Sequence, residues 1–252
     1  MAKPAAERAP APTDADNDRI WLKSYPDGTP AEIGALSHTS IAALFDDAFA
    51  RYAERRAFSC MGKAISYGEL DAASNAFAAH LQSLGLQKGD RVALMMPNIL
   101  QYPVAMAGVL RAGMTVVNVN PLYTPRELEH QLNDSGARAI VILENFANTL
   151  QQVIDDTQVE HAIVATMGDM MGFKGHIVNL VVRHVKKMVP AYSLPDAVGF
   201  NKVLAEGARE TLKPVAIGHD DVAFLQYTGG TTGVSKGAVL LHKQVIANVL
   251  QN

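Results

Sequence analysis

The stretch that decides the fold class runs from residue 91 to residue 143 and reads RVALMMPNILQYPVAMAGVLRAGMTVVNVNPLYTPRELEHQLNDSGARAIVIL. It contains three short apolar runs of strand length, at residues 91–96, 115–119 and 139–143. Each of the two segments between them is long enough for a helix. Strands that alternate with helices at this spacing are typical of βαβ units, whose strands lie parallel. We therefore predict an α/β fold with a mostly parallel sheet.

Signals for helix ends mark both intervening segments. Asn98 is predicted to cap the first helix, inside which Pro103 requires a kink or an early position. Thr124 and Glu127 form a capping-box pattern with a proline at the first helical position between them. This second helix is predicted to end near Gly136, because glycine accepts the left-handed conformation that closes many helices.

The alternation continues on both sides of this stretch. Upstream, we predict an amphipathic helix with an apolar face from Ile41 to Tyr52, a hairpin of residues 58–60 and 64–67, and a helix from a Ser66–Glu69 capping box to Gly85. Downstream, we predict a helix at 145–155 and strands at 161–166 and 222–226. Residues 167–201 break the rhythm and are predicted to be an insertion.

Composition excludes several classes of protein. The chain has 252 residues and a formal net charge of −3, without the basic excess that is typical of nucleic-acid binders. Cys60 is the single cysteine, so the chain forms no internal disulfide and no cysteine-based zinc site. No apolar run approaches the roughly 18 residues expected of a membrane span. These features predict a cytoplasmic protein.

One glycine-rich loop carries the chemistry. Residues 227–237 read YTGGTTGVSKG and directly follow the predicted strand at 222–226. Glycines let backbone N–H groups approach a phosphate closely, threonine hydroxyls add donors, and Lys236 adds a positive charge. The loop therefore predicts a polyphosphate-binding site.

Three other motifs are tested against this loop. The Walker A order fails because Lys236 precedes Gly237, and the glycine spacing does not fit the dinucleotide fingerprint. Residues 233–237 do match the G-x-S-x-G nucleophile elbow, with Ser235 as the serine. A hydrolase triad also needs an acidic residue and a histidine after the serine. The sequence after Ser235 contains His242 but no aspartate or glutamate. The hydrolase interpretation is therefore not favoured.

The loop resembles the phosphate-binding signature of the adenylate-forming superfamily, which includes acyl-CoA synthetases, peptide-synthetase adenylation domains and firefly luciferase. It departs from the usual pattern twice, with Gly229 in place of a serine and Ser235 in place of a proline. The double glycine is similar to that of bacterial long-chain fatty-acid–CoA ligases. So are the stretches YGEL (67–70), GDRV (89–92), RAG (111–113) and NVNPLYTPRELE (118–129).

The resemblance implies ATP-dependent ligation of a fatty acid to coenzyme A, in two steps. The carboxylate first attacks the α-phosphate of ATP, and the coenzyme A thiol then attacks the acyl-adenylate. ATP, Mg²⁺ and coenzyme A are thus the implied cofactors and co-substrates. The residues implied to bind the β- and γ-phosphates are Thr228, Gly229, Gly230, Thr231, Thr232, Gly233 and Lys236. Of these, Thr231 or Thr232 is implied to lie nearest the Mg²⁺.

The resemblance also implies a domain organisation. Residues 1–20 are predicted to be a disordered tail, and residues 21–252 the N-terminal portion of the AMP-binding domain. Family members carry later adenine, ribose and metal-binding segments and a small C-terminal domain with an adenylating lysine, none of which can be located in this chain. We therefore expect an inactive fragment without catalytic residues of its own. The alternative is a non-catalytic nucleotide-binding or regulatory module that ends naturally at Asn252.

Two further features carry hypotheses. By resemblance, His242 lines the acyl pocket, and the alternative is a polar residue at the start of the last helix. The segment from Gly175 to Tyr192 (GHIVNLVVRHVKKMVPAY) has an apolar helical face of six residues and a polar face that includes Lys186 and Lys187. A basic amphipathic helix can lie on an anionic membrane, here the inner face of the cell membrane. The alternative is an ordinary surface helix packed on the core.

Overall fold

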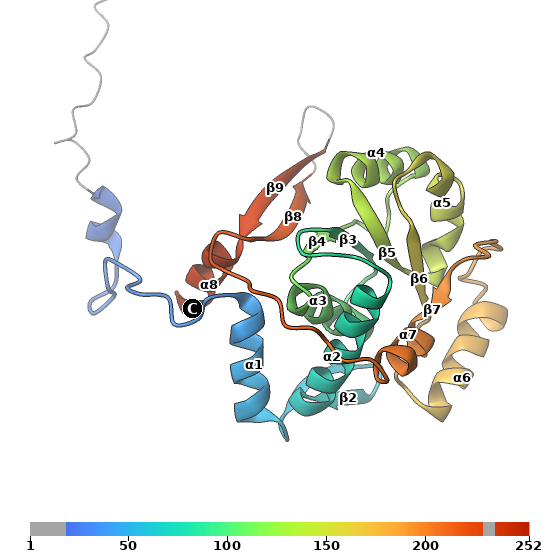
Figure 1. Cartoon of the computed structure of the whole chain (residues 1–252), viewed down its shortest axis with the longest axis horizontal. Helices are drawn as coiled ribbons and strands as arrows, with labels where there is room; N and C mark the ends of the chain where they lie inside the picture. Colours follow the sequence, from blue (N-terminus) through green and yellow to red (C-terminus); the bar gives the residue numbers. More distant parts are fainter. Residues whose placement is uncertain (1–18, 229–234, 252) are drawn as a thin grey trace, which may run out of the picture.

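The computed structural model describes residues 19–228 and 235–251, and its centre is one seven-stranded sheet (Figure 1). The strand order is β7-β6-β5-β3-β4-β8-β9, and all neighbours are parallel except β8 and β9. The prediction of a mostly parallel α/β fold is therefore confirmed. The strands are β3 (Arg91–Met95), β4 (Thr115–Asn118), β5 (Ala137–Leu143), β6 (His161–Ala165), β7 (Val198–Gly199), β8 (Val222–Thr228) and β9 (Lys236–Leu241).

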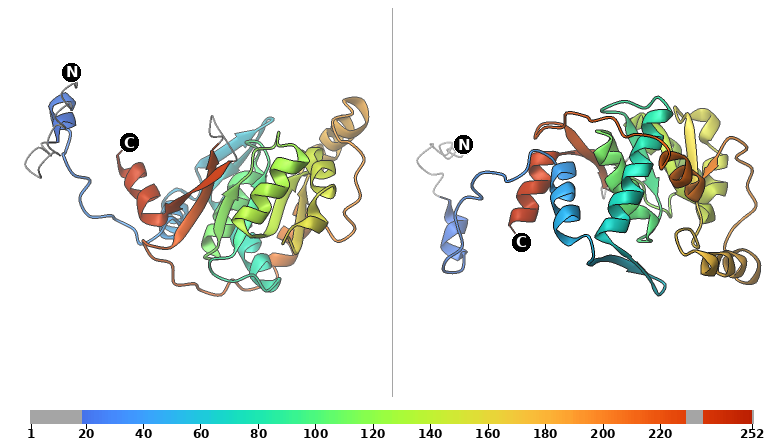
Figure 2. Two further views of the ribbon diagram at one scale, coloured as in Figure 1. Left: turned by 90° about the horizontal axis from the view of Figure 1, so that it is seen from above. Right: turned by 60° about the horizontal axis from the view of Figure 1, so that its bottom comes forward.

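Helices cover both faces of the sheet (Figure 2). The first face carries α2 (Tyr67–Ser83), α3 (Gln101–Arg111) and α7 (Phe200–Gly207), and the second carries α4 (Pro125–Ser135) and α5 (Ala147–Gln151). Alternate residues of one strand serve the two cores, since Val92 and Leu94 of β3 belong to the first and Ala93 and Met95 to the second. Burial on both faces explains the continuous apolar runs of the central strands.

Smaller elements lie outside the main sheet. Helix α1 (Ile41–Tyr52) packs beside α8 (His242–Leu250), and the predicted hairpin forms from β1 (Arg56–Cys60) and β2 (Lys63–Ser66). A short 3₁₀ turn, η2 (Ile20–Ser24), precedes them. The predicted tail at 1–20 falls almost entirely outside the described residues. Within the described residues, no helix combines the length and the apolar character needed to cross a bilayer.

The predicted helix caps are mostly confirmed. The Ser66 side chain accepts from the Glu69 N–H at 3.1 Å, and Glu69 accepts from the Ser66 N–H at 2.7 Å. Thr124 and Glu127 form the same box at the start of α4. That helix closes at Gly136, whose φ of 60° is left-handed. Glycine is favoured there because other residues are strained in this region.

The cap predicted at Asn98 is wrong, since α3 begins at Gln101. The cause is Pro103. A helix capped at Asn98 would place the proline at its fifth position, where its missing N–H would be needed for a bond to the carbonyl of residue 99. Starting at Gln101 places Pro103 third, among the positions whose N–H groups have no partner inside the helix.

A helix at 145–155 and an insertion at 167–201 were also predicted. The helix expected at 145–155 is broken into η3 (Glu144–Phe146), α5 and η4 (Ile154–Asp156), in a stretch whose asparagines and aspartates are weak helix formers. The insertion at 167–201 contains α6 (Phe173–Leu180), a five-residue π-helical turn η5 (Val181–Val185) and the edge strand β7.

Strand β9 was not predicted. Most of its side chains are exposed or half-exposed, so the sequence shows no alternation of buried and exposed positions that would mark a strand.

Candidate nucleotide-binding site

The two arms of the glycine-rich loop are the last residues of β8 and the first of β9. These strands pair antiparallel, with Thr228 opposite Lys236 and Tyr227 opposite Gly237. The pairing brings two of the predicted phosphate-binding residues, Thr228 and Lys236, side by side at the base of the loop, and both are exposed. Gly229, Gly230, Thr231, Thr232 and Gly233 lie outside the described residues.

Close packing explains the glycine after Lys236. A Cβ atom built on Gly237 would lie 2.9 Å from the ring of Tyr227, which is shorter than real side chains tolerate. The tyrosine ring is buried and covers the backbone of β9 at this point. Gly237 therefore lets the second arm lie directly against the first.

Helix α4 holds the first arm through Tyr227. The Tyr227 hydroxyl donates to Asp134 Oδ2 at 2.6 Å. Burial raises the pKa of this tyrosine well above its usual range, and the neighbouring carboxylate raises it further. The hydroxyl therefore stays protonated at neutral pH and acts as a permanent donor to α4.

Ser235 connects the second arm to the same helix. Its hydroxyl donates to the Thr228 carbonyl at 3.2 Å and lies 3.5 Å from the Tyr123 hydroxyl. Its own carbonyl is 3.3 Å from Nε2 of His130. A strand, β9, follows Ser235, whereas a nucleophile elbow requires a helix there. The geometry supports setting the hydrolase interpretation aside.

An amide network continues the site along the carboxyl edge of the sheet. Asn118, at the end of β4, donates to Gln226 of β8 at 2.9 Å and accepts from the Tyr102 hydroxyl at 2.8 Å. Gln131 of α4 donates to the Asn118 carbonyl at 2.7 Å. This network fixes β4, β8 and α4 relative to one another just below the loop.

Three residues that contact the arms of the loop had no predicted role: Tyr123, His130 and Asp134. For Tyr123 a signal was present, because it lies in the stretch 118–129, which resembles the ligases, whereas His130 and Asp134 lie beyond that stretch. The sequence does not show that these residues lie near the loop, since about 100 residues separate them from it and only strand order places them together.

His242 begins α8 and is buried. Its Nδ1 accepts from the Ile41 N–H at 3.0 Å, so the ring binds the first residue of α1. Burial lowers the pKa of His242, which keeps the ring neutral and able to accept this bond. The predicted acyl-pocket role of His242 stays a prediction.

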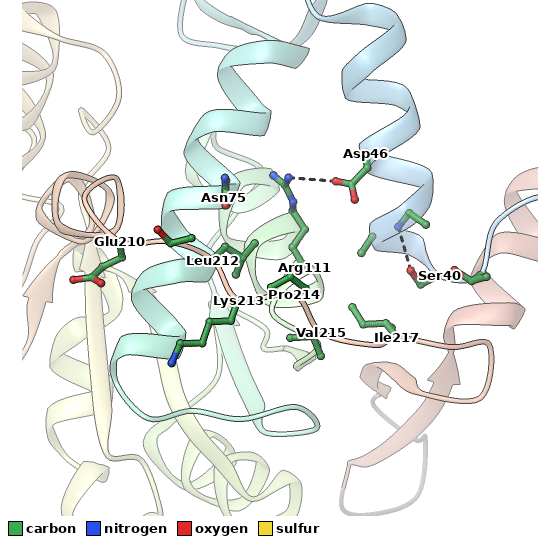
Figure 3. Close-up of a pocket in the computed structure, with 14 residues that line it drawn as sticks. Ser40, Asp46, Asn75, Arg111, Glu210, Leu212, Lys213, Pro214, Val215 and Ile217 are labelled. Carbon is green, nitrogen blue, oxygen red and sulfur yellow. Dashed lines mark hydrogen bonds and ion pairs between the residues drawn. The ribbon is translucent and has the colours of Figure 1, made fainter.

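A cavity of about 590 Å³ is separate from the loop (Figure 3). It lies between α1, α2, α3 and the segment 210–217, and none of the predicted site residues lines it. Arg111 reaches into it but bonds Asp46 at 3.2 Å and Asp71 at 2.7 Å. The arginine therefore joins three helices and is already neutralised. No cluster of three metal-ligating side chains occurs in the part of the chain that the structure describes.

Comparison with known proteins identifies the family. Residues 45–252 match the family described as AMP-binding enzyme, which is most of the chain. The chain belongs to the AMP-binding enzyme family. The loop with its paired arms is therefore the candidate nucleotide site of a family member.

Curated relatives are similar over nearly the whole chain. A long-chain-fatty-acid–CoA ligase of Yersinia pestis is 57% identical over 93% of this chain and 42% of its own length. The corresponding protein of Salmonella typhimurium is 56% identical over 92% of this chain and 42% of its own length. The chain thus spans about two fifths of the length of these relatives.

A solved structure gives the same result for the fold. A long-chain-fatty-acid-CoA ligase from Archaeoglobus fulgidus superposes with a TM-score of 0.69 at 26% identity, covering 90% of this chain and 41% of that one. The similarity shows that the sheet of this chain has the fold found in that enzyme.

Proposed function

We propose that this chain is the N-terminal portion of an ATP-dependent, AMP-forming fatty-acid–CoA ligase. The observation that carries the proposal is the loop of residues 227–237, whose arms are paired at Thr228 and Lys236 and fixed to α4. Family membership and the names of the relatives support the same activity. Residues 21–252 would then be the first part of the AMP-binding domain.

In this proposal the loop binds the β- and γ-phosphates of ATP. The first half-reaction brings a carboxylate to a polyanion, so catalysis depends on neutralising charge and positioning the reactants. Lys236 supplies a cation at the mouth of the hairpin, Thr228 a hydroxyl, and the glycines backbone donors. Mg²⁺ would add charge neutralisation, with the hydroxyl of Thr231 or Thr232 nearest to it. Coenzyme A is the acceptor in the second half-reaction.

The second candidate is a non-catalytic nucleotide-binding module. It shares the loop and both arms, so binding of ATP does not separate the two. The distinction is turnover by the full-length protein. We propose that residues 1–252 alone do not form acyl-CoA, because the adenylating lysine and the metal-binding segment of the family lie in parts that this chain does not contain.

The test is ligase activity of the full-length protein and its Lys236→Ala variant. Wild type should form acyl-CoA and release AMP and pyrophosphate from a fatty acid, ATP and coenzyme A. Loss of one charge-assisted contact costs about 1.5–3 kcal/mol, so Lys236→Ala should lower kcat/KM for ATP by about 10- to 100-fold. The exposed Lys202 on α7 provides the control variant Lys202→Ala, which should be unchanged. ATP binding without acyl-adenylate formation from any fatty acid would favour the non-catalytic module.

A further inference from the structure

The segment of α6, η5 and the residues that follow exposes several large apolar side chains. We call Phe173, Ile177, Leu180, Val185 and Met188 the outer face, and their exposed fractions are 80, 55, 57, 66 and 58%. Helical spacing of three and four residues puts the first three on one side of α6. Contiguous exposed apolar side chains of this size mark interaction sites more often than single exposed residues do.

One polar residue of α6 faces the protein while its large apolar residues are exposed. Asn179 accepts from the Gly168 N–H at 2.7 Å and donates to Thr166 Oγ1 at 2.9 Å. Val182 is the one buried side chain of η5. The expected apolar face of Val178, Val181, Val182, Val185, Met188 and Val189 is therefore divided, because Val182 packs inward while Val185 and Met188 point outward. The single helix expected from Gly175 to Tyr192 is also shorter, because helical structure ends at Val185.

Polar anchors hold the segment with its outer face exposed. Arg183 forms an ion pair with the fully buried Glu144 at 2.6 Å. Asn145 donates to the Met188 carbonyl at 2.9 Å, and Asn148 to the Ala191 carbonyl at 2.7 Å. The anchors lie on the protein side, so exposure of the apolar side chains follows from a fixed arrangement.

The surroundings of the outer face are basic. Lys174, Lys186 and Lys187 are exposed, and none of them forms an ion pair within residues 19–228 and 235–251. No aspartate or glutamate occurs in the sequence between Asp169 and Asp196. This local excess of positive charge contrasts with the net charge of −3 of the whole chain.

The segment lies at one extremity of the molecule. It lies in the chain between β6 and the edge strand β7, and in the views of Figures 1 and 2 it is at the opposite end from α8 and the β8–β9 arms of the loop. A large flat partner can therefore contact the outer face without approaching the nucleotide site.

We propose that the outer face and its three lysines dock the protein on an anionic lipid bilayer. Apolar side chains enter the interfacial region, and the lysines bind acidic headgroups. Charge complementarity favours this occupant over a second copy of the chain, which would bring the same lysines together. The docking surface itself does not depend on the proposed function. Only the benefit of docking rests on it, because a fatty-acid substrate would partition into the same bilayer.

The test is partitioning of the full-length protein onto vesicles. Wild type should co-float with vesicles of phosphatidylcholine and phosphatidylglycerol, and much less with phosphatidylcholine alone. Each lysine near such a surface raises the partition coefficient about fivefold. The triple variant Lys174→Glu/Lys186→Glu/Lys187→Glu should therefore lower partitioning by about 100-fold or more. Phe173→Ser/Ile177→Ser/Leu180→Ser should abolish it.

Matched controls separate the surface from general effects. Ile33 is 42% exposed and lies outside every stretch assigned to the nucleotide site, so Ile33→Ser is the apolar control. The exposed Lys23 provides the charge control Lys23→Glu. Both should bind vesicles as wild type does. All variants should melt as wild type and keep ligase activity on a short, water-soluble fatty acid without vesicles. That activity tests the proposed function separately from docking.

A direct measurement adds a second criterion. The chain has one tryptophan, Trp21, so Trp21→Phe/Phe173→Trp places the only indole on the outer face. Its fluorescence should be quenched by brominated lipid. Absence of quenching, equal binding to neutral and anionic vesicles, or unchanged partitioning of the serine variant would each overturn the proposal. So would a change of oligomeric state in the outer-face variants without any lipid dependence, which would assign the surface to a second copy.

Discussion

The bond between Tyr227 and Asp134 tests whether α4 supports the nucleotide loop. Tyr227→Phe keeps the buried ring against Gly237 and removes only the hydroxyl that donates to Asp134 at 2.6 Å. A hydrogen bond to a charged group contributes about 1.5–3 kcal/mol. Asp134 is exposed and regains water in the variant, so we expect a loss near the lower end, about 1.5 kcal/mol. In a domain of this size, that loss lowers Tm by roughly 3–6 °C.

The functional expectation is a change in ATP affinity. If the bond holds the first arm in its binding geometry, KM for ATP in the full-length protein rises by up to about tenfold, since 1.4 kcal/mol corresponds to a factor of ten. The turnover number with saturating ATP should change little, because the contact is equally present before and during the reaction. Tyr52→Phe, on the partly exposed face of α1, is the matched control and should alter neither quantity.

A double-mutant cycle with Asp134→Ala isolates the interaction. The sum of the stability losses in the two single variants should exceed the stability loss in the double variant by about 1 kcal/mol. A coupling energy below about 0.3 kcal/mol would show that the two groups do not act together and would refute the reasoning. A fall in Tm with no change in KM would show that the bond contributes only to stability. Helix α4 would then have no role in binding the nucleotide.

Three further predictions concern other groups. His242→Asn keeps an acceptor for the Ile41 N–H but does not titrate. The pKa of His242 lies below 6.5 in the folded protein, so as the pH falls below that value the unfolded wild type takes up the proton first. The free energy of unfolding of the wild type should therefore decrease more steeply than that of the variant, by up to about 1.4 kcal/mol per pH unit. Urea titrations between pH 6.5 and 5 measure this difference. Parallel curves would contradict this. Arg183→Met leaves the buried Glu144 unpaired and should cost about 3 kcal/mol, most of it restored in Glu144→Gln/Arg183→Met, whereas a loss below about 1 kcal/mol would mean that water replaces the arginine. Gly237→Ala should displace the tyrosine ring opposite it and cost about 1–3 kcal/mol, and an unchanged Tm would show that β9 shifts freely.

The elements predicted correctly are those whose signals are local. The capping boxes at Ser66 and Thr124 and the closing glycine at Gly136 each depend on residues within one turn of the helix end. The strands of the sheet centre are equally plain, because burial on both faces leaves uninterrupted apolar runs.

The elements predicted wrongly are those that depend on distant neighbours or on competing local rules. Asn98 has the right side chain for a cap, but Pro103 decides where α3 begins. Strand β9 carries no periodic pattern and forms because β8 offers it a partner. In the Gly175–Tyr192 segment, the polar residue Arg183 faces inward because Glu144 is buried beneath it, which no helical periodicity could indicate.

Strand order explains why the candidate site includes α4. Strands β4 and β8 are parallel neighbours, so their carboxyl ends lie at the same edge of the sheet. The chain that leaves β4 must therefore pass beside the loop that leaves β8, and the residues that leave β4 are those of the stretch 118–129. Ligands of open α/β sheets bind at this edge. The loop and the stretch 118–129, two of the stretches that resemble the ligases, thus lie together for a topological reason. We expect variants in either one to affect the same step, the binding of ATP.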